Sequence, residues 1–230
     1  MAVNKPPRRT LVRWPEAWRI VPSRFPPRGV FDRIASPDDL EALYAIEAMT
    51  NARLRQELGQ LDLVPRERRI SGPGTQPVMA AFTHLNPDGS RFSDGSYGVF
   101  YAARTLDTAI AETMYHRGRF MAATREPAMK LDMRCYRTSI EGRLHDLRKG
   151  WAAMLRPDDY RAPQALAREL RAAGSDGVVY PSVRHAGGEC VGVFFPDLVK
   201  PCVQAQHLIY SWDGERMQAE YAVATLHKAP

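Results

Sequence analysis

Residues with chemically active side chains follow one another closely in the middle of the sequence. Arg91 lies in the loop Ser90-Arg-Phe-Ser-Asp-Gly-Ser96, Tyr101 follows ten residues later, and Glu112 lies twenty-one residues after the arginine. The chain contains no GxxxxGK(S/T), no GxGxxG after an expected strand, no HExxH and no GxSxG. The absence of these motifs argues against four kinds of site, namely a P-loop, a Rossmann nucleotide site, a zinc protease site and a serine hydrolase site.

The charge of the chain narrows the range of its partners. There are 32 Lys and Arg residues against 26 Asp and Glu, which gives a net charge of +6 and an isoelectric point near 9.4. Such a surplus attracts polyanions, which include nucleic acid, phosphate-bearing cofactors and acidic protein partners. Charge alone does not choose among these three classes.

Two blocks of the sequence resemble the RES domain. That family has an arginine in a Gly/Ser-rich loop, a tyrosine on the following strand and a glutamate on the next helix, which is the order of Arg91, Tyr101 and Glu112. A second block, Ser175-Asp-Gly-Val-Val-Tyr-Pro-Ser-Val-Arg184, is similar to the family's downstream signature. The chain departs from the family at the arginine loop, where Arg91-Phe-Ser-Asp-Gly95 replaces the more usual Gly-Gly-Arg-Trp-Asn-Pro.

The resemblance implies a fold similar to that of ADP-ribosyltransferases, with a split mixed β-sheet core and flanking helices. It also implies that the chain is a toxin of a toxin-antitoxin pair, which uses NAD as its substrate and needs no metal. Breaking the bond between nicotinamide and ribose passes through an oxocarbenium-like state, and a nearby carboxylate stabilises that state.

The resemblance also assigns roles to individual residues. Glu112 is expected to supply the carboxylate, Arg91 to pair with the pyrophosphate or the adjoining ribose, and Tyr101 to stack on nicotinamide or orient the ribose. Ser182 is expected to hydrogen-bond the nicotinamide amide or the ribose. Weaker candidates for contacts with the cofactor phosphates or the acceptor are Arg184, His185 and Arg33. Without the resemblance, the same residue types fit a solvated helix glutamate, surface arginines, a core tyrosine and a strand-end serine.

Cleavage of this bond does not by itself identify the acceptor of ADP-ribose, because a protein, water and inorganic phosphate are all chemically suitable acceptors. The longer RES members resemble this chain more than the short ones do, which favours mono-ADP-ribosylation of a cellular protein, with phosphoribosyl pyrophosphate synthetase as the candidate target. An NAD glycohydrolase or NAD phosphorylase that depletes NAD is the first alternative. A toxin that acts on RNA or binds nucleic acid and a non-catalytic binding module are alternatives from other classes.

The partner that the resemblance implies is an antitoxin of the Xre type. It has a helix-turn-helix domain and a C-terminal segment that covers the NAD cleft. Acidic residues of that segment are expected to pair with Arg91 or Arg184. Nucleic acid is then expected to associate with the chain only indirectly, through the antitoxin.

Length and composition fit one globular domain, with 230 residues of which 44% are hydrophobic and 25% charged. Residues 1–30 are expected to form a basic, proline-rich N-terminal extension that is a solvated arm. Trp14 and Trp18 indicate that part of this arm packs on the rest of the protein, a catalytic domain expected over 31–230. The sequence has no run of 18 apolar residues and no secretory signal, which predicts a cytoplasmic protein without membrane contact. Three widely spaced cysteines favour reduced thiols.

Helices and strands alternate irregularly along the chain, which predicts an α+β fold. Helices are expected from Ser36 onward, from Thr105 onward and at 163–173, where Gly174 ends the helix. On the second of these helices, Glu112 falls beside the apolar stripe, on the same flank as His116. Strands are expected at 78–82, 97–103, 129–134, 177–181, 191–195, 207–212 and 219–225.

Overall fold

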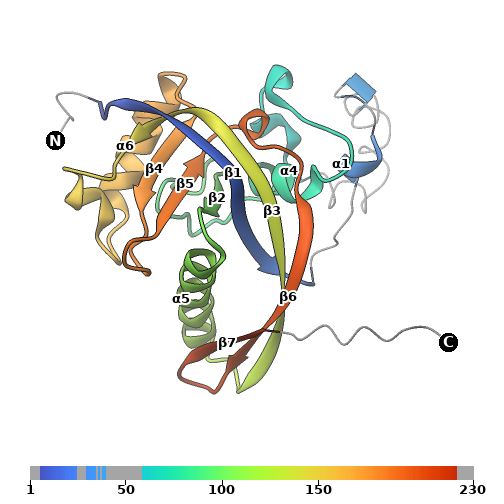
Figure 1. Ribbon diagram of the computed structural model, residues 1–230, viewed down its shortest axis with the longest axis vertical. Helices are drawn as coiled ribbons and strands as arrows, with labels where there is room; N and C mark the ends of the chain where they lie inside the picture. The colour runs from blue at the N-terminus through green and yellow to red at the C-terminus, as the bar shows by residue number, and fades with distance from the viewer. Residues whose placement is uncertain (1–5, 25–29, 35, 37, 40–58, 222–230) are drawn as a thin grey trace.

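The computed structural model describes residues 6–24, 30–34, 36, 38–39 and 59–221 of the chain. Within these residues, seven strands form one mixed sheet in the order β1-β2-β5-β4-β3-β6-β7 (Figure 1). The strands are β1 (Arg9–Pro22), β2 (Phe100–Ala103), β3 (Met129–Asp146), β4 (Gly177–Pro181), β5 (Glu189–Val193), β6 (Val203–Trp212) and β7 (Met217–Tyr221). A mixed sheet with helices packed against it confirms the predicted α+β class.

The sheet curls so that β1 meets two other strands. It pairs with β2 at Trp18 opposite Ala103, and with β3 along most of its length, ending at Pro22 opposite Met133. β3 and β4 run parallel, whereas the other neighbouring strands run antiparallel. β1 therefore closes a ring with β2, β5, β4 and β3, and it brings an early part of the chain beside the strand that carries Tyr101.

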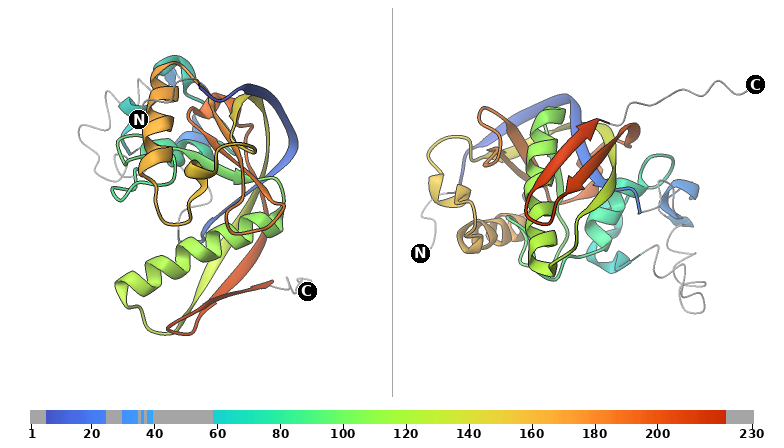
Figure 2. Two further views of the ribbon diagram at one scale, coloured as in Figure 1. Left: turned by 90° about the vertical axis from the view of Figure 1, so that its left-hand side faces the viewer. Right: turned by 90° about the horizontal axis from the view of Figure 1, so that it is seen from below.

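Helices cover the sheet over two apolar clusters. The helices are α1 (Val30–Arg33), α4 (Gln76–Thr83), α5 (Leu106–Thr124) and α6 (Arg161–Ala172), and short 3-10 turns lie at Leu61–Leu63, Arg66–Arg68, Ala152–Leu155 and Pro196–Leu198. α1 and α4 pack on a cluster around Phe31 and Phe100, while α5 and α6 pack on a cluster around Phe92 and Tyr180. Figure 2 shows α5 running beside β7. None of the described helices is both long and apolar enough to span a bilayer.

Residues 9–22 correct the prediction of a solvated N-terminal arm. They form β1, on which Trp14, Ala17 and Ile20 are buried. The alternation of buried and exposed residues breaks at a register shift between Trp14 and Ala17, where Pro15 has no N–H to donate. This irregularity hides the period of two that marks a strand, so a segment with several prolines and arginines resembles a solvated arm.

Residues 78–82, predicted as a strand, lie in helix α4 instead. Pro77 occupies the first turn of α4, where its missing N–H is not needed, and Thr75 is the residue that precedes the helix. A short apolar run does not show by its periodicity whether it is a helix or a strand, so the prediction failed here. The strand predicted at 97–103 is also shorter than expected, since β2 begins at Phe100.

The other elements predicted within the described residues are confirmed, most of them with shifted ends. α5 begins after Thr105, whose side chain accepts a hydrogen bond from the Thr108 N–H at 3.3 Å. α6 ends just before Gly174, which has a φ of 72°. The strand predicted at 129–134 continues as β3 to Asp146. The body of the helix predicted from Ser36, and residues 222–225 of the last predicted strand, lie outside the described residues.

Candidate active site

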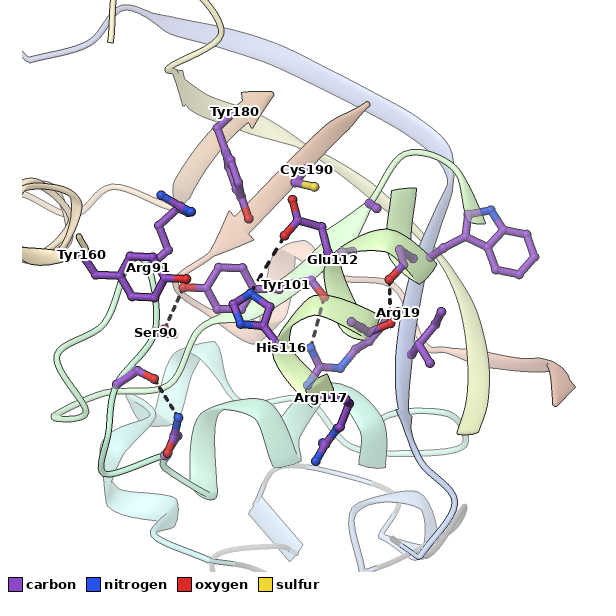
Figure 3. A pocket seen from close by; sticks show the side chains of 18 residues that line it. Arg19, Ser90, Arg91, Tyr101, Glu112, His116, Arg117, Tyr160, Tyr180 and Cys190 are labelled. Carbon is purple, nitrogen blue, oxygen red and sulfur yellow. Dashed lines mark hydrogen bonds and ion pairs between the residues drawn. The ribbon is translucent and has the colours of Figure 1, made fainter. Parts of the chain in front are cut away.

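A cavity of about 400 Å³ lies between β1, β2 and α5. Arg91, Tyr101 and Glu112 all line it, so the fold brings the three residues of the sequence block together (Figure 3). Arg91 comes from the loop before β2, Tyr101 from β2 itself and Glu112 from the second turn of α5. Further polar residues that line the cavity include Arg19, Ser90, His116, Arg117, Tyr160 and Tyr180.

The carboxylate of Glu112 is fixed through one of its two oxygens. Oε1 accepts hydrogen bonds from the Ser182 Oγ at 2.6 Å and from the Val183 N–H at 3.2 Å. Oε2 lies 4.0 Å from Nε2 of His116, one turn along α5, and makes no hydrogen bond with any described residue (Figure 3). Neutral donors therefore orient one oxygen, while the other remains available to a ligand in the cavity.

Arg91 is buried and is anchored by backbone oxygens. Its Nη1 donates to the Met154 carbonyl at 3.2 Å and to the Arg156 carbonyl at 2.9 Å. The guanidinium also lies over the Tyr160 ring, 4.8 Å from its centroid. Within the described residues, Nε and Nη2 make no hydrogen bond and no carboxylate pairs with Arg91. Its charge and two of its nitrogens thus remain for an anionic ligand.

The Tyr101 hydroxyl holds the loop that carries Arg91. It accepts a hydrogen bond from the Phe92 N–H at 2.9 Å and lies 2.8 Å from the Ser90 Oγ. Gly192 faces Tyr101 on β5, and a Cβ at that glycine would stand 3.4 Å from the tyrosine ring and 3.2 Å from Phe92. Burial raises the pKa of Tyr101, so the phenol stays protonated at neutral pH. The ring lines the cavity while the hydroxyl fixes the residues on both sides of Arg91.

Two residues predicted to bind the cofactor do not line this cavity. Ser182 donates its hydroxyl proton to Glu112 and accepts the N–H groups of Arg184 at 3.1 Å and His185 at 2.9 Å. A serine hydroxyl has one donor and two acceptor positions, so these contacts use all of them. Ser182 therefore positions Glu112 in this arrangement. Arg33 is exposed on α1 and is not among the lining residues.

Arg184 and His185 also lie outside the cavity lining. The Arg184 guanidinium stacks on the Tyr115 ring, 3.3 Å from its centroid, and Nη2 donates to the Pro157 carbonyl at 2.6 Å. The His185 Nδ1 lies 2.8 Å from the Thr108 Oγ1, at the start of α5. Both side chains thus join the loop after β4 to neighbouring segments.

Arg19 is a cavity residue that the sequence analysis missed. It lies on β1, where Nη1 donates to the Tyr101 carbonyl at 3.1 Å and the guanidinium lies over the Phe100 ring at 4.7 Å. Its Nε is buried and has no hydrogen-bond partner among the described residues. Burial lowers the pKa of Arg19. The signal that could have found it was the pair Trp14 and Trp18, which marked this segment as docked, since Arg19 follows Trp18 directly.

Tyr180 on β4 and Cys190 on β5 add neutral groups to the cavity wall. Burial raises the pKa of both side chains, so they stay protonated at neutral pH. Among the described residues, no group of three or more His, Cys, Asp or Glu side chains is arranged to hold a metal ion. One carboxylate, that of Glu112, thus lines the cavity together with three guanidinium groups. The guanidinium groups belong to Arg19, Arg91 and Arg117.

Comparison with known proteins identifies the family. The sequence profile described as "RES domain" matches residues 66–213. The "Uncharacterized protein y4oC" of Sinorhizobium fredii (strain NBRC 101917 / NGR234) is 34% identical over 209 residues, which cover 90% of this chain and 87% of that protein. The crystal structure of the M. tuberculosis MbcT-MbcA toxin-antitoxin complex aligns with a TM-score of 0.40 and 16% identity, over 56% of this chain and 74% of that chain. Because the profile covers more than half of the sequence, the chain belongs to the RES-domain family.

Proposed function

We propose that this RES-domain protein is the toxin of a toxin-antitoxin pair and cleaves the bond between nicotinamide and ribose in NAD. The observation that carries the proposal is the single cavity in which Arg91, Tyr101 and Glu112 meet. Membership of the RES-domain family supports it, because the resemblance to RES toxins implies action on NAD.

The charges of the cavity suit NAD as a substrate. NAD carries a negatively charged pyrophosphate and a nicotinamide ring that is positively charged until its bond to ribose breaks. Arg91 and Arg19 offer guanidinium donors that have no carboxylate partner among the described residues, which suits pyrophosphate oxygens. Glu112 is the one acidic side chain that lines the cavity in the described part of the chain. A volume of about 400 Å³ also falls in the usual range for small-molecule sites.

Glu112 is placed to assist the cleavage itself. Positive charge develops on the ribose as the bond breaks, while the leaving nicotinamide takes the electron pair and becomes neutral. A carboxylate that is oriented beforehand stabilises this charge without having to reorganise. Ser182 and Val183 supply the orientation through Oε1, which leaves Oε2 for the ribose.

ADP-ribose then passes to an acceptor, and we take this acceptor to be a side chain of a cellular protein. Phosphoribosyl pyrophosphate synthetase is the candidate target, because the longer RES members resemble this chain more than the short ones do. Hydrolysis or phosphorolysis of NAD without a protein target is the alternative that the experiment below separates from transfer.

An Xre-type helix-turn-helix antitoxin is the proposed partner, with a C-terminal segment that covers the cavity. That segment was predicted to form ion pairs with Arg91 or Arg184, but both arginines expose little surface to a partner. Arg91 is 7% exposed, and the side chain of Arg184 is 13% exposed. An antitoxin that contacts Arg91 would therefore have to insert a side chain into the cavity.

Incubation of the purified chain with a cell lysate and NAD labelled in its adenylate phosphate tests the proposal. A labelled protein supports transfer, free ADP-ribose or its phosphate without a labelled protein supports depletion, and intact NAD contradicts both. Glu112→Gln is expected to slow cleavage about a hundredfold to a thousandfold, because the amide keeps the size but loses the charge. Glu215→Gln, in an exposed turn, is the matched control and should leave the rate unchanged.

A further inference from the structure

Helix α5 and strand β1 together line two hollows in succession. Around the first, the proposed NAD cavity, α5 contributes lining residues between 109 and 117 and β1 contributes 18–20. Around the second, of about 480 Å³, α5 contributes lining residues between 117 and 121, and 22–24 follow at the end of β1. Arg117 lines both hollows. Because residues three and four apart share a helix face, the same face of α5 lines both hollows, and Arg117 lies where the two linings meet.

The second hollow gathers exposed apolar side chains. Phe120 is 49% exposed and Met129 is 41% exposed, and they are two of the four large hydrophobic residues that are exposed in the described part of the chain. Met121 and Met133, which are buried, form part of the wall of the same hollow. Flexible thioethers adapt to different partners, and a gathering of exposed apolar groups marks a contact surface.

Cationic groups lie where the two hollows meet. Within the described residues, Arg117 makes no hydrogen bond and no ion pair. Burial, and then the nearby charge of Arg24, lower the pKa of Arg117. Lys130 adds a third cation to the lining, against the carboxylates of Glu126 and Asp132. Arg117, which has no ion pair with a described residue, therefore favours an anion at this point of the lining.

We infer that the second hollow is the docking groove of the protein that accepts ADP-ribose, and that it binds an extended acidic segment of that protein. An apolar residue of the segment packs on Phe120 and Met129, and a carboxylate pairs with Arg117 where the hollows meet. The neighbouring part of the segment then reaches the NAD cavity. This inference rests on the proposed transfer to a protein and adds the chemistry by which the acceptor is recognised.

Binding of short probe peptides tests the groove independently of catalysis. A fluorescent peptide that alternates aspartate with leucine is expected to bind the full chain, whereas one that alternates lysine with leucine is not. Phe120→Ser should weaken the binding of the aspartate peptide about tenfold. Val203→Ser removes another exposed apolar side chain, outside the groove, and should have no effect. Equal binding of both peptides, or equal loss in both variants, would overturn the inference.

The charge of the groove is tested with the same aspartate peptide. Arg24→Glu should weaken its binding about tenfold, and the effect should shrink as salt screens the charges. Arg161→Glu, at a side chain that is 89% exposed and lies outside the groove, is the control and should leave binding unchanged. Weakening of the same size in both variants would show only a general effect of net charge and would count against the groove.

Labelling with NAD tests the role of the groove in transfer. In Phe120→Ser, the labelling of a lysate protein should fall about tenfold. Cleavage of NAD without lysate should keep its kcat and KM, because Phe120 does not line the NAD cavity. A raised KM for NAD would show that the hollow holds part of the dinucleotide and would overturn the inference, as would unchanged labelling. If the wild-type chain leaves NAD intact, the proposed function fails, while the peptide measurements still decide whether the groove exists.

Discussion

The arginines of the cavity and the arginines that join distant segments are held by different kinds of partner. Arg91 donates to two backbone carbonyls, at 2.9 and 3.2 Å, and Arg19 donates to one at 3.1 Å. Arg68 instead donates to carboxylates, those of Asp176 at 2.6 Å and Asp197 at 2.8 Å. The same type of side chain thus stands in two different environments of one molecule.

This difference shows how the fold keeps positive charge available at the cavity. Burial lowers the pKa of Arg68, but the hydrogen bonds to Asp176 and Asp197 outweigh it and raise the pKa overall. Burial also lowers the pKa of Arg19, which has no carboxylate partner among the described residues. A carbonyl orients a guanidinium without neutralising it, whereas a carboxylate does both. Arg68 therefore acts as a structural clamp, and Arg91 remains free to bind an anion.

Arg91→Lys is the substitution with the largest expected effect, since it tests whether a cavity arginine binds the substrate. Lysine keeps the charge but loses the planar fork that reaches two carbonyls and a ligand at once. We expect kcat/KM for NAD to fall about a hundredfold, mainly through KM, with a small change in the melting temperature. Steady-state kinetics and a thermal melt measure the two effects. An unchanged KM would contradict the proposed role of Arg91 in binding the pyrophosphate.

Arg68→Ala is expected to show the opposite behaviour. The substitution leaves Asp176 and Asp197 without their shared cation and removes the contact of the guanidinium with the Phe195 ring, whose centroid is 4.3 Å away. The free energy of unfolding should fall by about 2 kcal/mol. KM and kcat should stay close to wild type, because Arg68 does not line the cavity. Urea unfolding and NAD kinetics on the same preparation check both halves, and an effect on KM would remove the distinction between clamp and binding group.

Ser182→Ala tests whether the carboxylate of Glu112, like the guanidinium of Arg91, depends on the neutral groups that hold it. The Glu112 carboxylate is also held by neutral groups, and the alanine variant removes one of them while the Val183 N–H keeps its contact with Oε1. We expect kcat to fall about tenfold with little change in KM, because the carboxylate is less well oriented in the transition state. Ser96→Ala, at an exposed serine that bonds Asp94, is the control. A change confined to KM would instead indicate direct contact between Ser182 and the substrate.

The sequence predicted the central part of the fold better than its edges. The helix after Thr105 and the strands at β3 to β6 were found, because their apolar periods are long or their flanking turns are clear. β1 was missed because its period of two breaks at Pro15, and α4 was taken for a strand because its apolar run is short. Periodicity within a segment does not show which distant strand will pair with it.

The same limit explains what the sequence revealed of the site. Arg91, Tyr101 and Glu112 were predicted together because they lie within one block whose order resembles a family pattern, and all three line the cavity. Arg19 was missed because it reaches the cavity only through the closure of the sheet by β1. Ser182 was expected at the ligand, but its place beside Glu112 depends on how the loop after β4 meets α5, which is a tertiary contact.

The smallest expected effect appears at acid pH, where the ion pairs between arginines and carboxylates should weaken. Hydrogen bonding from Arg148 lowers the pKa of Asp146. A carboxyl whose pKa is lower in the folded than in the unfolded state stabilises the fold at neutral pH, and this contribution is lost as the pH falls from about 4 toward the folded pKa. The contribution should be about 1 kcal/mol or less, because both side chains of the pair are partly exposed.

Urea unfolding of the wild type and Asp146→Asn at pH 7 and at pH 3 measures this contribution. The wild type should be the more stable at pH 7, and the difference should shrink at pH 3, because the carboxyl takes up protons more readily in the unfolded than in the folded state. Arg91 gives the control, because its carbonyl partners take up no proton in this range. The difference in unfolding free energy between the wild type and Arg91→Lys should therefore be equal at both pH values. If that difference also shrinks in acid, a titrating group supports Arg91 and the contrast between the two sets of arginines does not hold.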